Sequence, residues 1–148
     1  MSDKDFTLIM PLYNGTEFIE RTVKSLAQQT YLDKMKIIVL EDNSSDGSRD
    51  ILEHCSEKYS VPMTIFSPPP NEHFGYSYSQ RLLYRKIETP FWAYLAFSDY
   101  WCEPDHIERG VRFLKEHSDF VMYASNYYQE LPNGKRFPLV DERRVANS

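Results

Sequence analysis

Five short apolar runs, separated by segments with helical periodicity, constrain the fold of this chain more than any other feature of its 148 residues. The run 36–40, Lys-Ile-Ile-Val-Leu, is rich in β-branched residues and does not alternate, which is typical of a strand covered on both faces. Strands that alternate with helices of ordinary length indicate βαβ units and a mostly parallel sheet. The predicted strands are 6–10, 36–40, 63–66, 91–97 and 120–123, and the predicted helices are 16–29, 48–59, 79–87 and one opened by Pro104.

The sequence therefore predicts an α/β fold, a three-layer αβα Rossmann-like domain with a mostly parallel sheet. Asn133-Gly134 between two short runs is a strong hairpin signal, so a C-terminal β-hairpin is expected over about 125–140. The length suits a single domain over 1–148, and no internal boundary is visible.

Charge and cysteine content exclude some classes of protein. A net charge of −5 argues against a nucleic-acid-binding protein, which needs a basic face. Cys55 and Cys102 are too few for a disulfide framework and lie in no metal-binding pattern, so two reduced thiols are expected. The chain shows no signal peptide, and its longest apolar stretch is too short to cross a bilayer. We expect a cytoplasmic protein, with peripheral association at the inner face of a membrane left open.

Polar and acidic side chains follow three of the predicted strands. In an open parallel sheet the ligand lies outside the carboxyl ends of the strands. Asp42 could accept hydrogen bonds from a ribose or a base, although a turn or helix-cap role suits it equally well. Asp99 could bind a divalent cation that bridges two phosphates, or it could belong to the start of the Pro104 helix. We expect the two aspartates to end neighbouring strands and to face one cleft.

Three further residues near these strand ends have less specific interpretations. Tyr13 could stack on a base, but half-buried packing is the more common role of a tyrosine at a strand end. Gly75 could let a loop approach a ligand, although a plain turn glycine accounts for it. His73 has no partner at metal-ligand spacing and is assigned no role. The sequence contains no GxGxxG, Walker or GxSxG motif, which argues against the usual dinucleotide-binding, P-loop and hydrolase classes of protein.

Four motifs follow one another along the chain, at residues 8–14, 25–31, 38–48 and 99–105. In this order they resemble the opening half of family 2 glycosyltransferases with the GT-A fold. They cover residues 6 to about 124, which the resemblance identifies as a nucleotide-sugar-binding half. The first is similar to the family's strand and P-x-Y-N turn, and the second to its S-x-x-x-Q-T-Y segment. The third matches V-x-D-D-x-S-x-D-G-[ST], and the fourth matches D-Y-W-x-x-P-[DN].

The resemblance implies transfer of a sugar from a UDP- or GDP-type nucleotide diphosphate-sugar to an acceptor hydroxyl, by inverting hexosyl or related transfer. The expected setting is the synthesis of polysaccharide, lipopolysaccharide or another cell-surface glycan, with an unidentified glycan or lipid acceptor. The resemblance assigns binding of the base and ribose to Pro11, Leu12, Tyr13 and Asp42. The family's D-x-D-D motif reads Ala-Phe-Ser-Asp at 96–99, so the resemblance makes Asp99 the ligand of a divalent cation, Mn or Mg. Ser98 could donate to a ribose hydroxyl.

Two departures from the family pattern leave alternatives open. Carboxylates are lost from the metal motif, and fewer charged ligands weaken cation binding. The family's catalytic base lies in a downstream acceptor half that has no counterpart here, so the base is unidentified. Either the chain is part of a longer protein or it is an incomplete enzyme. The alternatives to a transferase are a catalytically degenerate nucleotide-sugar-binding or interaction module and, more weakly, a response-regulator-like domain with an acidic turn at Glu41-Asp42.

Overall fold

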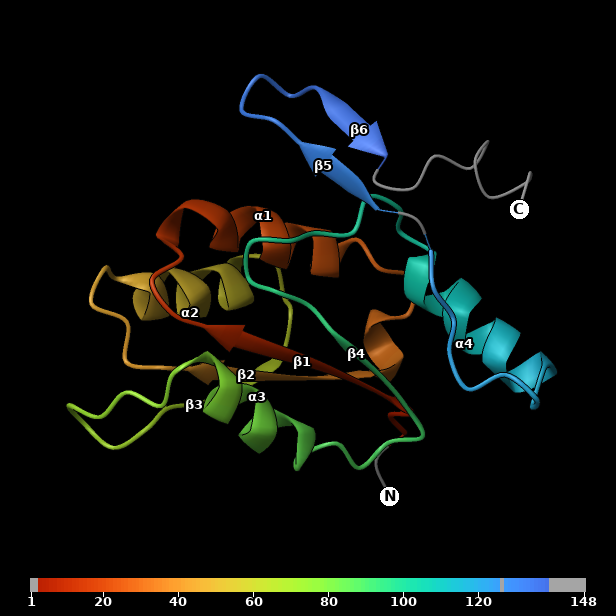
Figure 1. The fold of residues 1–148 in the computed structure, drawn as a ribbon, viewed down its shortest axis with the longest axis horizontal. Coiled ribbons are helices and arrows are strands. Elements are labelled where there is room, and N and C mark those ends of the chain that lie inside the picture. Colours follow the sequence, from red (N-terminus) through yellow and green to blue (C-terminus); the bar gives the residue numbers. More distant parts are fainter. Residues whose placement is uncertain (1–2, 126, 139–148) are drawn as a thin grey trace. The chain divides into compact units, whose positions relative to one another are not determined.

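The computed structural model describes residues 3–125 and 127–138 and divides the chain into two compact units, Met1–Arg109 and Gly110–Ser148. In the first unit a parallel sheet has the strand order β3-β2-β1-β4 (Figure 1). The elements in chain order are β1 (Phe6–Leu12), α1 (Thr16–Ala27), the 3₁₀ helix η1 (Leu32–Lys34), β2 (Met35–Glu41), α2 (Ser48–Lys58), β3 (Met63–Phe66), α3 (Tyr76–Tyr84), β4 (Phe91–Tyr94), α4 (His106–Glu116), β5 (Tyr128–Glu130) and β6 (Arg136–Pro138).

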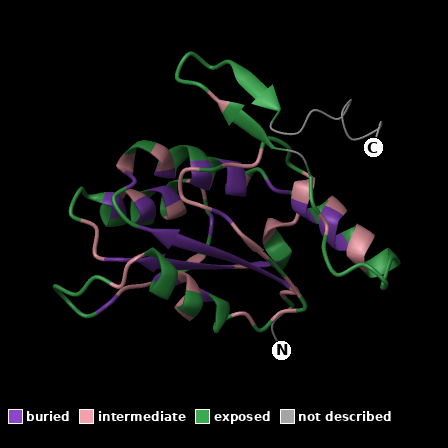
Figure 2. Ribbon diagram, in the orientation of Figure 1, coloured by how far each residue is buried: buried purple, intermediate pink, exposed green. Residues whose placement is uncertain are grey.

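The central strand β1 explains why the first apolar runs do not alternate. It pairs with β2 along its whole length, from Phe6 opposite Met35 to Leu12 opposite Glu41, and its other edge pairs with β4. Every residue of β1 is buried, because strands flank it on both sides and helices cover both faces (Figure 2). The sheet therefore fixes the end of β1 beside the end of β2, which is where the candidate ligand residues lie.

Helices cover the two faces of the sheet unequally. Figure 1 shows α1 and α2 together on one face and α3 on the other. Beneath α3, the buried side chains of Ile9, Ile38, Leu40 and Leu83 form a cluster that Phe66, Phe74, Leu82, Ile87 and Tyr94 extend. The predicted αβα arrangement and mostly parallel sheet are confirmed. Within the described residues, no helix is long and apolar enough to cross a membrane.

The predicted strand at 120–123 is wrong, because that segment has no strand conformation. Phe120, Val121 and Met122 are 52%, 99% and 71% exposed, and the run pairs with no strand among the described residues. Several boundaries also differ, and the strand predicted over 91–97 ends at Tyr94. The helix predicted from Ser79 begins three residues earlier, at Tyr76, and the helix assigned to Pro104 begins at His106.

The second unit contains the predicted hairpin. Strands β5 and β6 are antiparallel, with Tyr128 opposite Pro138, and Gly134 in the turn has a φ of +78° that favours glycine. The end of the predicted hairpin, 139–140, lies outside the described residues. The assignment of one domain to residues 1–148 stays a prediction.

The two cysteines differ in environment, and we expect their reactivity to differ. Cys55 is 2% exposed on α2, and burial, followed by the charge of Glu20, raises the pKa of its thiol, whereas Cys102 is exposed. Because the thiolate is the reactive form, native protein should react quickly with Ellman's reagent at one thiol and at both after denaturation. The Cys102→Ser variant should lose the fast phase; a fast phase that persists in it contradicts the burial of Cys55.

Candidate functional site

The turns that follow β1 and β2 are hydrogen-bonded to each other. The backbone N–H of Asn14 donates to Oγ of Ser44 at 3.0 Å, and that of Gly15 donates to Oγ of Ser48 at 2.7 Å. In the opposite direction, Ser45 N–H donates to the side-chain oxygen of Asn14 at 3.0 Å. Two motifs about 30 residues apart in the sequence therefore form one structure at the carboxyl end of the sheet.

Asp46 joins the start of α1 to the start of α2. Its carboxylate accepts hydrogen bonds from the backbone N–H and the hydroxyl of Ser48, at 3.0 and 2.5 Å, and from the N–H of Thr16 at 3.3 Å. Partial desolvation raises the pKa of Asp46, but the hydrogen bonds from Ser48 and Thr16 outweigh it and lower the pKa overall. The turn after β2 thus contributes a structural carboxylate at Asp46 as well as the candidate ligand Asp42.

Asp42 is buried and organises the loop before α3. Its Oδ1 accepts the N–H of Phe74 at 2.7 Å and its Oδ2 accepts the N–H of Gly75 at 2.8 Å. Nδ1 of His73 lies 2.9 Å from Oδ2, so the tautomer with hydrogen on Nδ1 adds a third donor. Three donors from one loop make this carboxylate a fixed part of the architecture, and this contact with a loop more than 30 residues away was not predicted.

The neighbouring Asn43 holds the chain that leads into this loop. Its side-chain amide donates to the carbonyl oxygens of Pro69 and Glu72 at 2.8 and 2.7 Å. Gly75, directly before α3, has a φ of +75°, which favours glycine, and it contacts Asp42 through its backbone. Gly75 therefore serves as the residue that joins this loop to α3.

A pocket of about 480 Å³ opens at the carboxyl end of the sheet. It lies in the first unit, and its walls come from the ends of β1 and β2, the loop before α3, α3 itself, and β4 with the segment after it. Its lining residues are Pro11, Leu12, Tyr13, Asp42, His73, Tyr76, Ser79, Tyr94, Ala96, Phe97 and Ser98. The structure thus brings together five of the six predicted site residues, all except Asp99.

Aromatic rings form much of the pocket wall. The Tyr13 ring is 44% exposed and lies 4.3 Å from the His73 ring, tilted by 41°. Elsewhere in the wall, the hydroxyls of Tyr76 and Tyr94 are 3.0 Å apart, and Gln80 donates to Tyr76 at 2.9 Å. Burial and the hydrogen bond with Tyr76 raise the pKa of the Tyr94 hydroxyl, which stays protonated at neutral pH.

Asp99 lies in a segment that α1 holds in place. The buried hydroxyl of Thr22 lies 2.8 Å from the carbonyl oxygens of both Phe97 and Asp99, to which it donates one hydrogen at a time. Gly15 is packed so closely that a Cβ there would collide with the Phe97 ring. These contacts fix the backbone of the segment while the side chain of Asp99 stays exposed.

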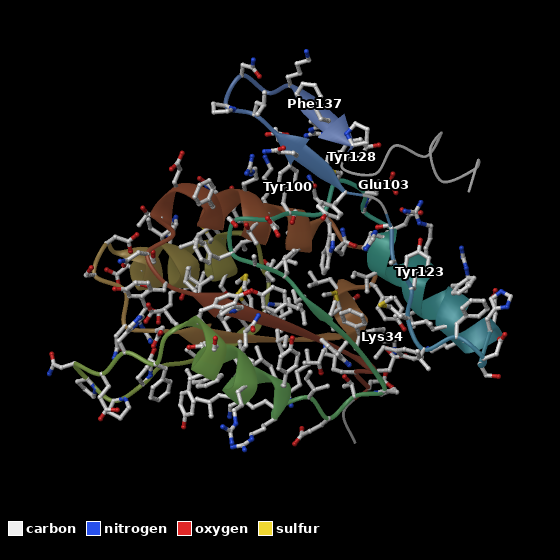
Figure 3. The ribbon with its side chains drawn as sticks, in the orientation of Figure 1. Lys34, Tyr100, Glu103, Tyr123, Tyr128 and Phe137 are labelled. Carbon is white, nitrogen blue, oxygen red and sulfur yellow. The ribbon has the colours of Figure 1, made fainter. Side chains whose placement is uncertain are left out.

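The second half of this segment is held by α1 and by the residues directly after it. Figure 3 labels Tyr100, whose ring lies 4.4 Å from the Arg21 guanidinium, and Glu103, whose carbonyl oxygen accepts a hydrogen bond from Gln29 at 2.8 Å. Trp101 N–H donates to the hydroxyl of Ser25 at 3.3 Å. The 25–31 and 99–105 motifs of the sequence are therefore joined as directly as the two turns.

The predicted relation between Asp42 and Asp99 is partly wrong. Strand β1 lies between β2 and β4, so the two aspartates do not follow neighbouring strands. Asp42 lines the pocket, whereas Asp99 directly follows the lining residue Ser98 without lining it. The order of the strands along the chain does not reveal that β4 crosses to the far side of β1, which is why the sequence analysis misplaced the pair.

Sequence reasoning missed several lining residues. His73 was assigned no role, because its contacts with Asp42 and Tyr13 depend on a loop conformation that residue spacing does not reveal. Tyr76 was missed because α3 begins earlier than its apolar pattern suggests, whereas Ser79 lay in the predicted helix and was assigned no role. The glycine at 75 was the one available signal for that earlier start.

A divalent cation would find few protein ligands at this site. Among the described residues no three His, Cys, Asp or Glu side chains are grouped as a metal site requires. Asp99 offers one exposed carboxylate. That suits a Mg or Mn ion only in the common arrangement in which one or two carboxylates bind it together with substrate phosphates.

Comparisons with known proteins agree with this geometry. The family model described as Glycosyl transferase family 2 matches residues 7–144. Glycosyltransferase AglE of Haloferax volcanii is 32% identical over 131 residues, which are 86% of this chain and 41% of that protein. The chain spans less than half the length of the curated relatives it matches.

Two solved structures share the fold. One is the mannosyltransferase PcManGT from Pyrobaculum calidifontis in complex with GDP-Man and Mn²⁺, with a TM-score of 0.66 and 21% identity over 74% of this chain and 32% of that one. The other is S. aureus TarS 1-349 in complex with UDP, with a TM-score of 0.68 and 21% identity over 77% of this chain and 33% of that one.

The contacts of Thr22 give a stability prediction. Thr22→Val keeps the side-chain shape but removes the hydroxyl between the carbonyls of Phe97 and Asp99, and a buried polar group left without its partner costs about 1–3 kcal/mol. We expect a loss of that size in the free energy of unfolding, measured by urea denaturation. The exposed Thr64→Val is the matched control, with an expected change within about 0.5 kcal/mol. Equal stability of the two variants would show that Thr22 does not hold the segment.

Proposed function

The chain belongs to glycosyl transferase family 2, and on that premise we propose that it forms the donor-binding half of a glycosyltransferase. It would bind a nucleotide diphosphate-sugar of UDP or GDP type and support transfer of a hexose or related sugar to an acceptor hydroxyl with inversion. The observation that carries the proposal is that Pro11, Leu12, Tyr13, Asp42 and Ser98 line one pocket at the carboxyl end of a parallel sheet, where such folds bind nucleotides.

The pocket suits the nucleoside part of the donor. Its wall is aromatic and aliphatic, with a few polar groups, which is the usual character of a small-molecule site. Under this proposal Tyr13 stacks at the exposed rim, Asp42 accepts an N–H or hydroxyl from inside, and Ser98 contacts the ribose. GDP-Man in the complex of PcManGT and UDP in that of TarS support a nucleotide as the ligand class.

A divalent cation, Mn or Mg, belongs to the proposal as a partner of the bound diphosphate. Asp99 would be its protein ligand, and the ion would stabilise negative charge on the diphosphate leaving group. The complex of PcManGT with Mn²⁺ supports this choice. The chain's own contribution is the fixed backbone at 97–99, which α1 holds through Thr22.

The pocket accounts for neither the catalytic base nor the acceptor. The catalytic base is unassigned, and the acceptor is proposed only by class, as a glycan or lipid in cell-surface polysaccharide synthesis. We propose a cytoplasmic location, with peripheral contact at the inner face of a membrane where a lipid-linked acceptor is used.

A second candidate is a nucleotide-sugar-binding or interaction module without catalysis. The observation that favours it is the single carboxylate at 96–99, where Ser98 replaces an acid, together with the lack of any metal-type cluster in the described part of the chain. Such a module would bind nucleotide with no metal dependence and would transfer no sugar. Transfer from a UDP- or GDP-sugar to a supplied acceptor would exclude this candidate.

Titration calorimetry with UDP and GDP, with and without Mn²⁺, tests the proposal. We expect one nucleotide to bind and Mn²⁺ to strengthen the binding. Asp99→Asn should abolish the strengthening by Mn²⁺ and leave both metal-free affinity and stability unchanged, since its side chain is exposed. Asp42→Asn should weaken binding with and without metal and should also lower stability, because its carboxylate holds the 73–75 loop.

The exposed Asp33→Asn is the matched control, because Asp33 precedes β2 at the opposite end of the strand. It should bind as the unaltered protein does. Absence of binding to either nucleotide under both conditions refutes the proposal. A full response to Mn²⁺ in Asp99→Asn refutes the metal assignment alone.

A further inference from the structure

One buried hydroxyl in the pocket makes no hydrogen bond to the part of the chain that the structure describes. Ser79 on α3 is 2% exposed, and within the described part of the chain its Oγ has no hydrogen-bond partner. Its backbone N–H donates to the carbonyl oxygen of Gly75 at 3.0 Å, as α-helical geometry requires. A helical serine hydroxyl commonly donates to a carbonyl one turn earlier, but Ser79 does not. A buried hydroxyl without a partner is rare and destabilising, so it calls for a ligand.

The position of Ser79 indicates which part of a ligand it meets. Ser79 lines the same pocket as Asp42, and the Gly75 N–H bound by Asp42 lies one helical turn before it. Among the lining residues the only ionisable groups besides tyrosines are Asp42 and His73, with no lysine or arginine to bind a diphosphate. Leu12, Tyr94 and neighbouring lining residues instead give a largely apolar wall. Such a wall suits a planar base.

We propose that Ser79 is a specificity-determining residue that donates its hydroxyl hydrogen to a carbonyl oxygen on the nucleobase. This inference rests on the proposed function, because it needs a nucleotide in the pocket. An ionised carboxylate has about four acceptor positions, and three donors already contact Asp42, so it can accept one more N–H. Uracil and guanine present a ring N–H beside a carbonyl oxygen. Asp42 and Ser79 together match that pair of groups.

The inference predicts weaker nucleotide binding without a loss of stability when the Ser79 hydroxyl is removed. Ser79→Ala removes the donor and should weaken binding of the preferred nucleotide, UDP or GDP, by about 3- to 10-fold, the usual effect of one neutral hydrogen bond. The melting temperature of the ligand-free variant should be unchanged or higher, because an unpaired hydroxyl has been removed. A loss of packing would instead lower both affinity and melting temperature.

The experiment compares three probes by displacement calorimetry: UDP, GDP and ribose 5-diphosphate, which has no base. Ser79→Ala should weaken binding of the preferred nucleotide. Its affinity for ribose 5-diphosphate should stay within about 2-fold of that of the unaltered protein. Ser77→Ala, an exposed serine on the same helix, is the matched control and should change nothing. The melting temperature of each variant is measured in parallel.

Each contrary result has its own meaning. Equal affinity of Ser79→Ala and the unaltered protein for UDP and GDP overturns the inference but not the proposed function. An equal loss for ribose 5-diphosphate also overturns it, because Ser79 would then act on the ribose, the phosphates or the fold. A lower melting temperature of Ser79→Ala overturns it as well. Failure of the unaltered protein to bind either nucleotide overturns both proposals.

Discussion

The candidate site depends on the buried carboxylate of Asp42 and the three donors that the 73–75 loop directs at it. A charge that is removed from water needs compensating hydrogen bonds, and this loop supplies them. The same bonds fix where α3 begins and so place Tyr76 and Ser79 in the pocket wall. Asp42 is therefore primarily a structural residue. A ligand can use only the acceptor positions of its carboxylate that the loop leaves free.

The remaining walls follow from paired motifs. The turn after β1 is bound to the turn after β2, and the segment after β4 is bound to α1 through Thr22 and to the residues after α1 through Gln29. The polar residues in these loops thus form specific hydrogen bonds between elements that are far apart in the sequence. These hydrogen bonds hold the carboxyl edge of the sheet together, and they leave the aromatic rim at Tyr13 and His73 partly exposed.

The sequence predicts the layers of the fold well because its signals are local. β-branched runs such as 36–40 and the polar turns behind them identify the strands and the edge where a ligand belongs. What it misses depends on contacts between distant residues: the order in which β4 lies beside β1, the loop that surrounds Asp42, and the early start of α3. The segment 120–123 has a strand-like pattern, but Val121 is 99% exposed, because an apolar run forms a strand only where another strand pairs with it.

The close packing of Gly15 under the Phe97 ring has a consequence for the dimensions of the pocket. Phe97 is part of the pocket wall, and only a residue without a side chain lets α1 approach the segment after β4 this closely. A single carbon atom at position 15 would push the ring outward and change the space available to a ligand without altering any polar group. Position 15 thus sets the width of the cavity from behind its wall, and relatives with a larger residue there would be expected to accommodate a differently shaped molecule.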